Sequence, residues 1–165
     1  MAAGATYEAI ATTTLSSAAT EVIFSSISGS YTDLVLVFEG TATSDLDICL
    51  QFNSDTGSNY SMTSIRGNGS TVVSERNSNV SKGITIGIIT GTRTMARAFI
   101  MNYSNATTYK SVLSRVDSTN ATYGLMARVG LWRSTSAITS IRFHLDVSNA
   151  IASGSTFTLY GIAAA

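Results

Sequence analysis

Residues 141–147 read IRFHLDV, and the alternation of apolar and polar side chains in this stretch decides the fold class. The apolar members share one face: Ile141, Phe143, Leu145 and Val147. The polar members share the other: Arg142, His144 and Asp146. Successive side chains of a strand point to opposite sides, so this period of two predicts a β-strand with one buried face.

The same signal continues outward along the chain. Residues 48–52 (ICLQF) alternate in the same way, and residues 34–39 (LVLVFE) are apolar on both faces until Glu39, which predicts a central strand covered on both sides. No run of ten residues has the three-and-four spacing of a surface helix. Strands are predicted at 7–14, 21–25, 33–41, 47–53, 60–66, 83–90, 97–103, 110–116, 123–132, 139–147 and 155–162.

This series of about ten short strands predicts one all-β domain over residues 7–165, an antiparallel β-sandwich of the jelly-roll type. Residues 1–6 (MAAGAT) form a featureless amino-terminal arm, which is either a floppy end or a segment that orders against a neighbouring subunit. Residues 68–82 (NGSTVVSERNSNVSK) are the most polar and least periodic stretch, and they predict a long loop with a role in recognition.

Composition excludes several classes of function. The 165 residues carry a formal net charge of zero and only 12% of them are charged, which disfavours binding to nucleic acid through clustered basic side chains. The amino terminus has no basic region or long apolar run, so we expect no signal peptide, no membrane span and synthesis in a cytoplasm. A weakly charged surface suits a protein that ends in an assembly.

The residues that could take part in catalysis are expected to have structural roles instead. Cys49 is the one cysteine, and a buried apolar side chain is expected there rather than a catalytic thiol. His144, with Arg142 and Asp146 two residues away on either side, predicts a local ladder of charges and hydrogen bonds rather than a relay to a nucleophile. There is no GxSxG elbow and no phosphate-binding or dinucleotide motif.

Loops and glycines give weaker signals. Residues 53–59 (NSDTGSN) have the oxygen-rich composition of a calcium loop, but they hold one carboxylate and predict a hairpin loop instead. Gly83, Gly87 and Gly91 are expected to leave room for a neighbouring backbone or aromatic ring. The Asn-X-Ser/Thr triplets are expected to mark turns, not glycosylation; they begin at Asn59, Asn68, Asn79, Asn102, Asn105 and Asn120.

Exposed aromatic residues are the remaining candidates for a binding role. Trp132 and the seven tyrosines could stack on sugars, but Trp132 ends an apolar strand (LMARVGLW) and is expected in the core or in an interface. The sequence therefore assigns no catalytic, cofactor-binding or metal-binding residue.

Several segments resemble small surface proteins of tailed-bacteriophage virions. They are IATTTLSSAATEVIFSSISGSYTDLVLV (10–37), LQFNSDTGSNYS (50–61), NYSNATTYKSVLSR (102–115), ARVGLWRSTSAITSIRF (127–143) and GSTFTLYGI (154–162). The resemblance spans nearly the whole chain and involves no catalytic motif. It implies a jelly-roll sandwich on the particle surface, either a capsid decoration (cement) protein or a part of a tail or head fibre, commonly trimeric.

From this resemblance we expect a non-enzymatic capsid decoration protein that binds the major capsid protein as a homotrimer and stabilises the shell. It would act at the virion surface, without nucleic-acid or membrane partners and without a cofactor. The alternative is a tail or head-fibre component that binds host-surface glycans. An enzyme on the same scaffold is not predicted, because a glycosidase needs two carboxylates across a cleft and several of the ten acidic residues, such as Asp33, Asp55 and Asp117, lie at expected loop edges.

Overall fold

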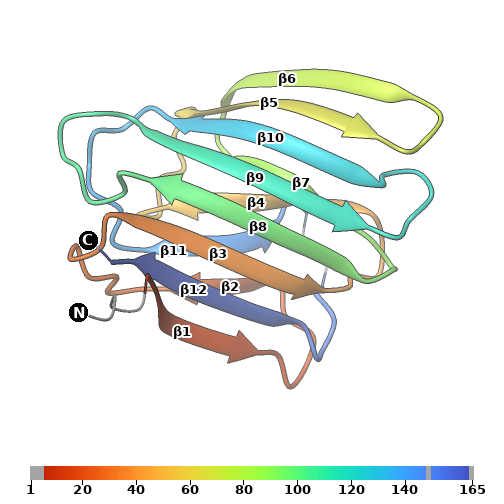
Figure 1. The fold of residues 1–165 in the computed structure, drawn as a ribbon, viewed down its shortest axis with the longest axis horizontal. Helices are drawn as coiled ribbons and strands as arrows, with labels where there is room; N and C mark the ends of the chain where they lie inside the picture. Colours follow the sequence, from red (N-terminus) through yellow and green to blue (C-terminus); the bar gives the residue numbers. More distant parts are fainter. Residues whose placement is uncertain (1–5, 148–149, 164–165) are drawn as a thin grey trace.

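The computed structural model describes residues 6–147 and 150–163, which form twelve β-strands and no helix (Figure 1). The strands are β1 (Tyr7–Thr14), β2 (Glu21–Phe24), β3 (Asp33–Gly40), β4 (Leu46–Phe52), β5 (Tyr60–Gly67), β6 (Val72–Val80), β7 (Ile84–Ile89), β8 (Thr94–Met101), β9 (Lys110–Ser118), β10 (Leu125–Trp132), β11 (Ile141–Leu145) and β12 (Thr156–Ile162). The amino-terminal arm expected at residues 1–6 lies, except for Thr6, outside the described residues.

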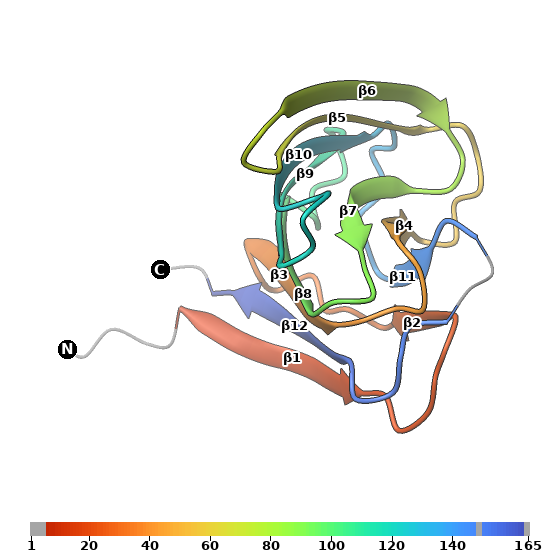
Figure 2. The ribbon, with the colours of Figure 1, turned by 90° about the vertical axis from the view of Figure 1, so that its right-hand side faces the viewer.

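Two antiparallel sheets face each other, and the larger one curls around the smaller (Figure 2). The eight-stranded sheet has the order β1-β12-β3-β8-β9-β10-β5-β6, and the four-stranded sheet has the order β2-β11-β4-β7. The orders β1-β12-β3-β8 and β2-β11-β4-β7 are those of the two sheets of an eight-stranded jelly roll, and β9, β10, β5 and β6 extend the large sheet beyond β8. The predicted all-β antiparallel sandwich is confirmed.

Eleven of these strands agree with the predicted segments to within a few residues, but β11 is shorter than expected. It ends at Leu145, and Val147 is exposed rather than a continuation of the buried face. Arg142 and His144 do share the outer face of the small sheet, but Asp146 lies past the end of the strand. The alternation in 141–147 therefore identified the strand correctly and overestimated its length.

The prediction of a long loop at residues 68–82 is wrong for most of these residues. Residues 72–80 form β6, which pairs with β5 from Gly67 to Tyr60 at the edge of the large sheet. Almost every side chain of β6 is exposed, on both of its faces. A strand that covers no core does not alternate between apolar and polar residues, and its backbone hydrogen bonds to β5 leave no mark in the sequence.

The core lies between the inner faces of the two sheets. Phe38 from the large sheet, Phe143 from the small sheet and Phe157 of β12 form one aromatic cluster, with ring centroids 4.8–5.0 Å apart. A second cluster joins Phe52 to Tyr60 and Trp132, whose two rings stack at 6.3 Å. Such clusters hold the sheets together through burial of large apolar surfaces.

Glycine lets the sheets approach closely at one central point. A Cβ at Gly87 of β7 would overlap the side chain of Val116 on β9. Gly83 has a φ of +104° and lies against the backbone of Leu50. Two of the three glycines therefore leave room for a neighbour, as expected. At Gly83 the neighbour is backbone, and at Gly87 it is a valine side chain and not an aromatic ring. At Gly91 the nearest atom to an added Cβ is at 3.8 Å, so that position needs no glycine for space.

The oxygen-rich segment at residues 53–59 is a structural loop, although it is not a hairpin. It crosses from β4 in the small sheet to β5 in the large one. The Asp55 carboxylate accepts hydrogen bonds from the Trp132 indole at 2.7 Å, the Gly57 amide at 2.8 Å and the Asn59 side chain at 2.9 Å. The single carboxylate of this loop is thus occupied by neighbours within the chain.

Cys49 lies in the interior, as expected, on β4 opposite Thr85. Burial raises the pKa of its thiol to about 12. We expect the native thiol to react with dithiobis(nitrobenzoate) at pH 8 only as fast as the protein opens, because the thiolate is the reactive form. In 8 M urea the reaction should finish within the mixing time. Complete labelling of the folded protein within minutes would contradict this burial.

Candidate functional site

The outer face of the eight-stranded sheet carries large apolar side chains in a place where no other layer of the described chain covers them. Phe99 on β8, Leu113 on β9 and Val129 on β10 lie directly opposite one another in the strand register. Their exposed fractions are 37%, 46% and 55%. We call these three residues the outer apolar row.

Further apolar side chains extend the outer apolar row along the same strands. They are Met95 and Met101 on β8, Leu125, Ala127 and Leu131 on β10, and Ile65 on β5. Single exposed apolar residues are ordinary on protein surfaces, but a contiguous group across four neighbouring strands is typical of an interaction site.

Local strand structure explains why these bulky residues point outward. On β8 the alternate residues Ala96 and Ala98 face the core, and on β10 the inward position opposite Val112 is Gly130. The small inward side chains fit the close approach of the two sheets near Gly87. The larger residues of the same strands are therefore left on the outer surface.

Two arginines lie beside the outer apolar row. Arg97 and Arg115 are directly opposite each other on β8 and β9, a like-charge pair that costs stability in a sheet. Arg115 donates to Asp117 at 3.1 Å, whereas Arg97 has no ion-pair partner among the described residues. A partner that supplied a carboxylate here would offset the repulsion.

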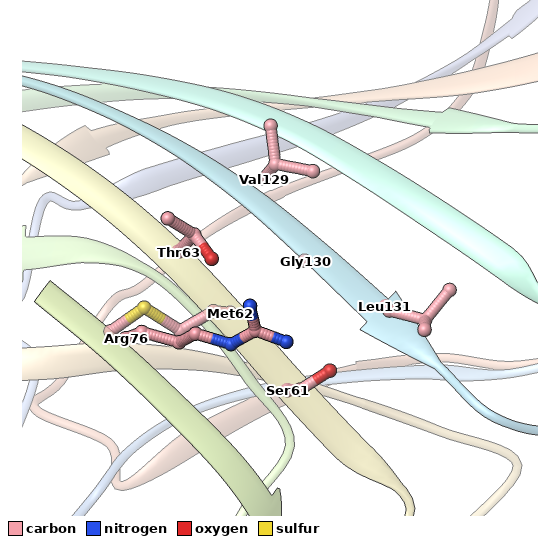
Figure 3. A pocket seen from close by; sticks show the side chains of 7 residues that line it. All are labelled: Ser61, Met62, Thr63, Arg76, Val129, Gly130 and Leu131. Atoms are coloured by element: carbon pink, nitrogen blue, oxygen red, sulfur yellow. The ribbon is translucent and has the colours of Figure 1, made fainter.

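A shallow hollow of ≈ 170 Å³ lies at the other side of the row, between β10 and the edge strands (Figure 3). Its lining includes Val129, Leu131 and Thr63, and the Arg76 side chain of β6 reaches across β5 toward them. Thr63 and Arg76 are opposite each other in the register of β5 and β6. The candidate surface therefore runs from β8 to β6, with apolar residues in the middle and arginines on both sides.

Beyond β8 the same outer face is mixed: Val35 of β3 lies directly opposite Phe99 but is buried, Tyr160 of β12 contacts the exposed ring of Tyr7 on β1, and threonines occupy the following positions of these two edge strands. On β12 and β1, Thr158 accepts a hydrogen bond from Thr12 at 3.2 Å, and Thr156 bonds Thr14 at 3.1 Å. This threonine ladder satisfies its own hydroxyls and presents no large apolar side chain. The exposed apolar side chains of this face are most closely grouped on β8, β9, β10 and β5, and we take these strands with β6 as the candidate interaction surface.

The residues singled out from the sequence do not gather at this surface. His144 is buried, and its ring nitrogens lie 2.8 Å from the carbonyl oxygens of Leu145 and Lys82. Arg142 donates to Glu21 and, at 3.2 Å, to Gln51, so the predicted ladder is wrong in its partners. The contacts of Arg142 run across strands to β2 and β4, because neighbouring strands bring side chains closer than two steps along one strand.

Trp132 and the Asn-X-Ser/Thr triplets have structural positions. Trp132 is buried, as expected, and is not available to stack on a sugar at the surface. Of the triplet asparagines, Asn68, Asn105 and Asn120 each accept hydrogen bonds from backbone amides two or three residues on, which is the geometry of a side-chain-stabilised turn. These three triplets agree with the expectation that they mark turns, whereas the triplet at Asn79 begins inside β6.

Clustered metal ligands and membrane-spanning helices are both absent from the described part of the chain. No group of three or more His, Cys, Asp or Glu side chains among residues 6–147 and 150–163 is placed to hold a metal ion. Within the same residues, no helix has the length and apolar character needed to cross a membrane.

The fold defines the class as an all-β antiparallel sandwich with jelly-roll strand order. No protein-family model and no curated protein sequence matches the chain. Among solved structures, alginate lyase Aly36B is similar over 90% of this chain and 78% of its own, with 9% identity and a TM-score of 0.35. A double mutant of the same lyase in complex with alginate tetrasaccharide gives 12% identity and a TM-score of 0.24, over 81% of this chain and 70% of its own. Similarity at this level supports no functional argument.

Proposed function

We propose that the chain is a non-enzymatic structural protein of a bacteriophage virion, a capsid decoration protein that binds the major capsid protein at the head surface. The observation that carries the proposal is the outer apolar row of Phe99, Leu113 and Val129, flanked by arginines. A contiguous apolar group with a charged rim has the anatomy of a protein–protein interface. The sequence resemblance to small virion proteins supports the same function independently.

In this function the sandwich acts as a rigid platform. The jelly-roll core fixes β8, β9 and β10, so the outer apolar row is presented without loop rearrangement and little conformational entropy is lost on binding. Burial of the row against the shell favours the assembled state by mass action. The proposal includes a homotrimer at threefold positions of the shell. The molar mass of the purified chain, measured by light scattering, tests whether it is a trimer.

The test is binding of the purified chain to particles that lack it, measured by co-sedimentation. The double variant Leu113→Asp/Val129→Asp places two charges in the centre of the outer apolar row. We expect its affinity for the particles to fall by at least about a hundredfold, because central apolar contacts dominate interface energies. Thermal unfolding of the variant shows whether the fold is kept.

The matched control is Thr158→Asp/Thr156→Asp, which adds the same charge to the polar part of the same outer face. It should bind like the parent chain. Equal losses for both double variants, or no loss for the first, would contradict the assignment of the surface. Immunogold labelling of intact particles then separates the locations: gold over the whole head supports decoration, and gold at the tail or at isolated projections supports the fibre alternative.

A further inference from the structure

A second hollow, of ≈ 270 Å³, is lined by residues of both sheets. The large sheet contributes Arg66, Glu75 and Arg128 to its lining. Asp47 at the start of β4, Asp146 just past β11 and Tyr123 of the β9–β10 turn complete it. Separate parts of the chain thus converge on one polar cavity.

Ion pairs fix the inner wall of this hollow. The Lys82 ammonium lies 3.2 Å from Asp47 Oδ2 and 3.2 Å from Asp146 Oδ2, and it joins the two carboxylates. Arg128 points inward from β10, and its side chain is only 2% exposed. Its Nη1 reaches Asp47 Oδ1 at 3.4 Å, which is long for a charged hydrogen bond. The wall is held in place, but its hydrogen bonding is incomplete.

Two buried polar atoms of this wall have no hydrogen-bond partner in the described part of the chain. They are Arg128 Nε, a donor, and Asp146 Oδ1, an acceptor. The other contact of the guanidinium is to the Met126 sulfur at 3.9 Å. Each unpaired buried group costs about 1–3 kcal/mol, so this wall is not arranged for stability alone. One residue of the lining thus lacks an acceptor and another lacks a donor, and a group that both donates and accepts hydrogen bonds matches the two.

The balance of charge selects the class of ligand. Four carboxylates line the hollow, from Asp45, Asp47, Glu75 and Asp146. The cations Arg66, Arg128 and Lys82 face them, which leaves a net charge of about −1 by this count. An anion is therefore not attracted, and no three or more acidic, histidine or cysteine side chains of the described residues are grouped to hold a metal ion. Hydroxyl groups of a neutral polyol match mixed donors and acceptors without a charge of their own.

The outer wall is formed by a stacked pair. The Arg66 guanidinium carbon lies 5.5 Å from the centroid of the Tyr123 ring. The pair adds a flat surface to the lining of the hollow. The volume of the hollow suits a single small ring rather than a drug-sized molecule.

We propose that this hollow binds one neutral sugar residue. A ring hydroxyl donates to Asp146 Oδ1 and accepts from Arg128 Nε, and the other hydroxyls bond with Glu75 and Arg66 at the opening. Both inner atoms are covered by neighbouring side chains, so the sugar reaches them after a side-chain adjustment of the kind common in binding. The inference rests on the hollow itself and does not depend on the location of the protein in a virion.

The experiment is an NMR titration of the full chain with glucose, galactose, mannose and N-acetylglucosamine, observed at the arginine Nε–Hε resonances. We expect saturable shifts of the Arg128 resonance with at least one of these sugars, in the presence of EDTA. Tyr123→Ala and Arg66→Gln should each lower the affinity for that sugar by about tenfold. This is the contribution of one or two net hydrogen bonds or stacking contacts. These rim positions leave the Lys82 ion pairs intact.

Arg97→Gln is the matched control, since it removes the same charge from the outer face, and it should leave the affinity unchanged. The proposal is overturned if none of the four sugars gives saturable shifts of Arg128, or if the rim variants bind as the parent does. Binding of galacturonate alone, or binding that requires added calcium, would overturn the neutral-sugar assignment.

Discussion

The substitution Phe38→Ala is expected to lower the free energy of unfolding by about 3–5 kcal/mol, the range for removal of a buried phenylalanine. Phe38 is completely buried on β3, and its ring contacts Phe143 of the small sheet at 5.0 Å and Phe157 of β12 at 4.9 Å between centroids. Loss of the ring leaves a cavity between the two sheets, which close-packed neighbours fill only in part.

Urea unfolding followed by the fluorescence of Trp132 measures this effect. Phe99→Ala is the control, because it removes the same side chain from the outer face, where 37% of it is exposed. We expect that variant to lose about 1 kcal/mol or less. Similar losses for the two variants would mean that the outer apolar row is buried in the isolated protein, and would argue against a free interaction surface.

The second large effect is expected for Asp55→Ala, with a loss of about 3 kcal/mol. The substitution removes the acceptor of the buried Trp132 indole and of two further donors, Gly57 and Asn59. Hydrogen bonds to a charged group contribute about 1.5–3 kcal/mol each, and an unpaired buried donor adds its own cost. The losses do not add in full, because the loop relaxes and water reaches the exposed donors.

The pH dependence of this effect has a definite sign. Burial raises the pKa of Asp55, but the hydrogen bonds from Trp132, Asn59 and Gly57 outweigh it and hold the pKa below its ordinary value. A depressed folded pKa stabilises the protein above the unfolded value, near 4, and this contribution is lost as the pH falls through the folded value. The difference in stability between parent and variant should therefore shrink below about pH 4.

Asp117→Ala is the matched control for Asp55→Ala. Asp117 also pairs with a neighbour, Arg115, but its side chain is largely exposed on β9. Exposed ion pairs contribute little, so we expect a change within about 0.5 kcal/mol and no marked pH dependence. A comparable loss in this variant would show that the effect at Asp55 reflects surface charge and not the bonds to the loop and indole.

The proposed capsid-binding surface was beyond prediction from the sequence, and β8 shows why. The segment TMARAFIM alternates with a period of two, but the alternation does not say which face is inside. Hydrophobicity alone would bury Met95, Phe99 and Met101. The structure buries Ala96 and Ala98 instead, because the sheets approach closely there. The small residues Ala96, Ala98 and Gly130 were the only sequence signal that could have indicated which face of these strands is inside.

The sugar-binding hollow depended even more on tertiary structure. Asp47, Arg128 and Asp146 are 81 and 18 residues apart along the chain, and none belongs to a recognisable motif. The unpaired atoms of Arg128 and Asp146 become visible only when β4, β10 and the end of β11 are placed together. The triad of Arg142, His144 and Asp146, which the sequence did suggest, is divided instead between cross-strand contacts and the Lys82 ion pairs.

The sequence by itself determined the all-β class, the approximate limits of eleven strands and the burial of Cys49 and Trp132, because each depends on local periodicity or on a strongly apolar segment. Tertiary structure alone decided the existence of β6, the outward face of β8 and the partners of His144 and Asp55. Each of these is fixed by the pairing of strands that are distant in the chain. Pairing is governed by backbone hydrogen bonds and by the space between the sheets, and the order of side chains along one strand carries neither.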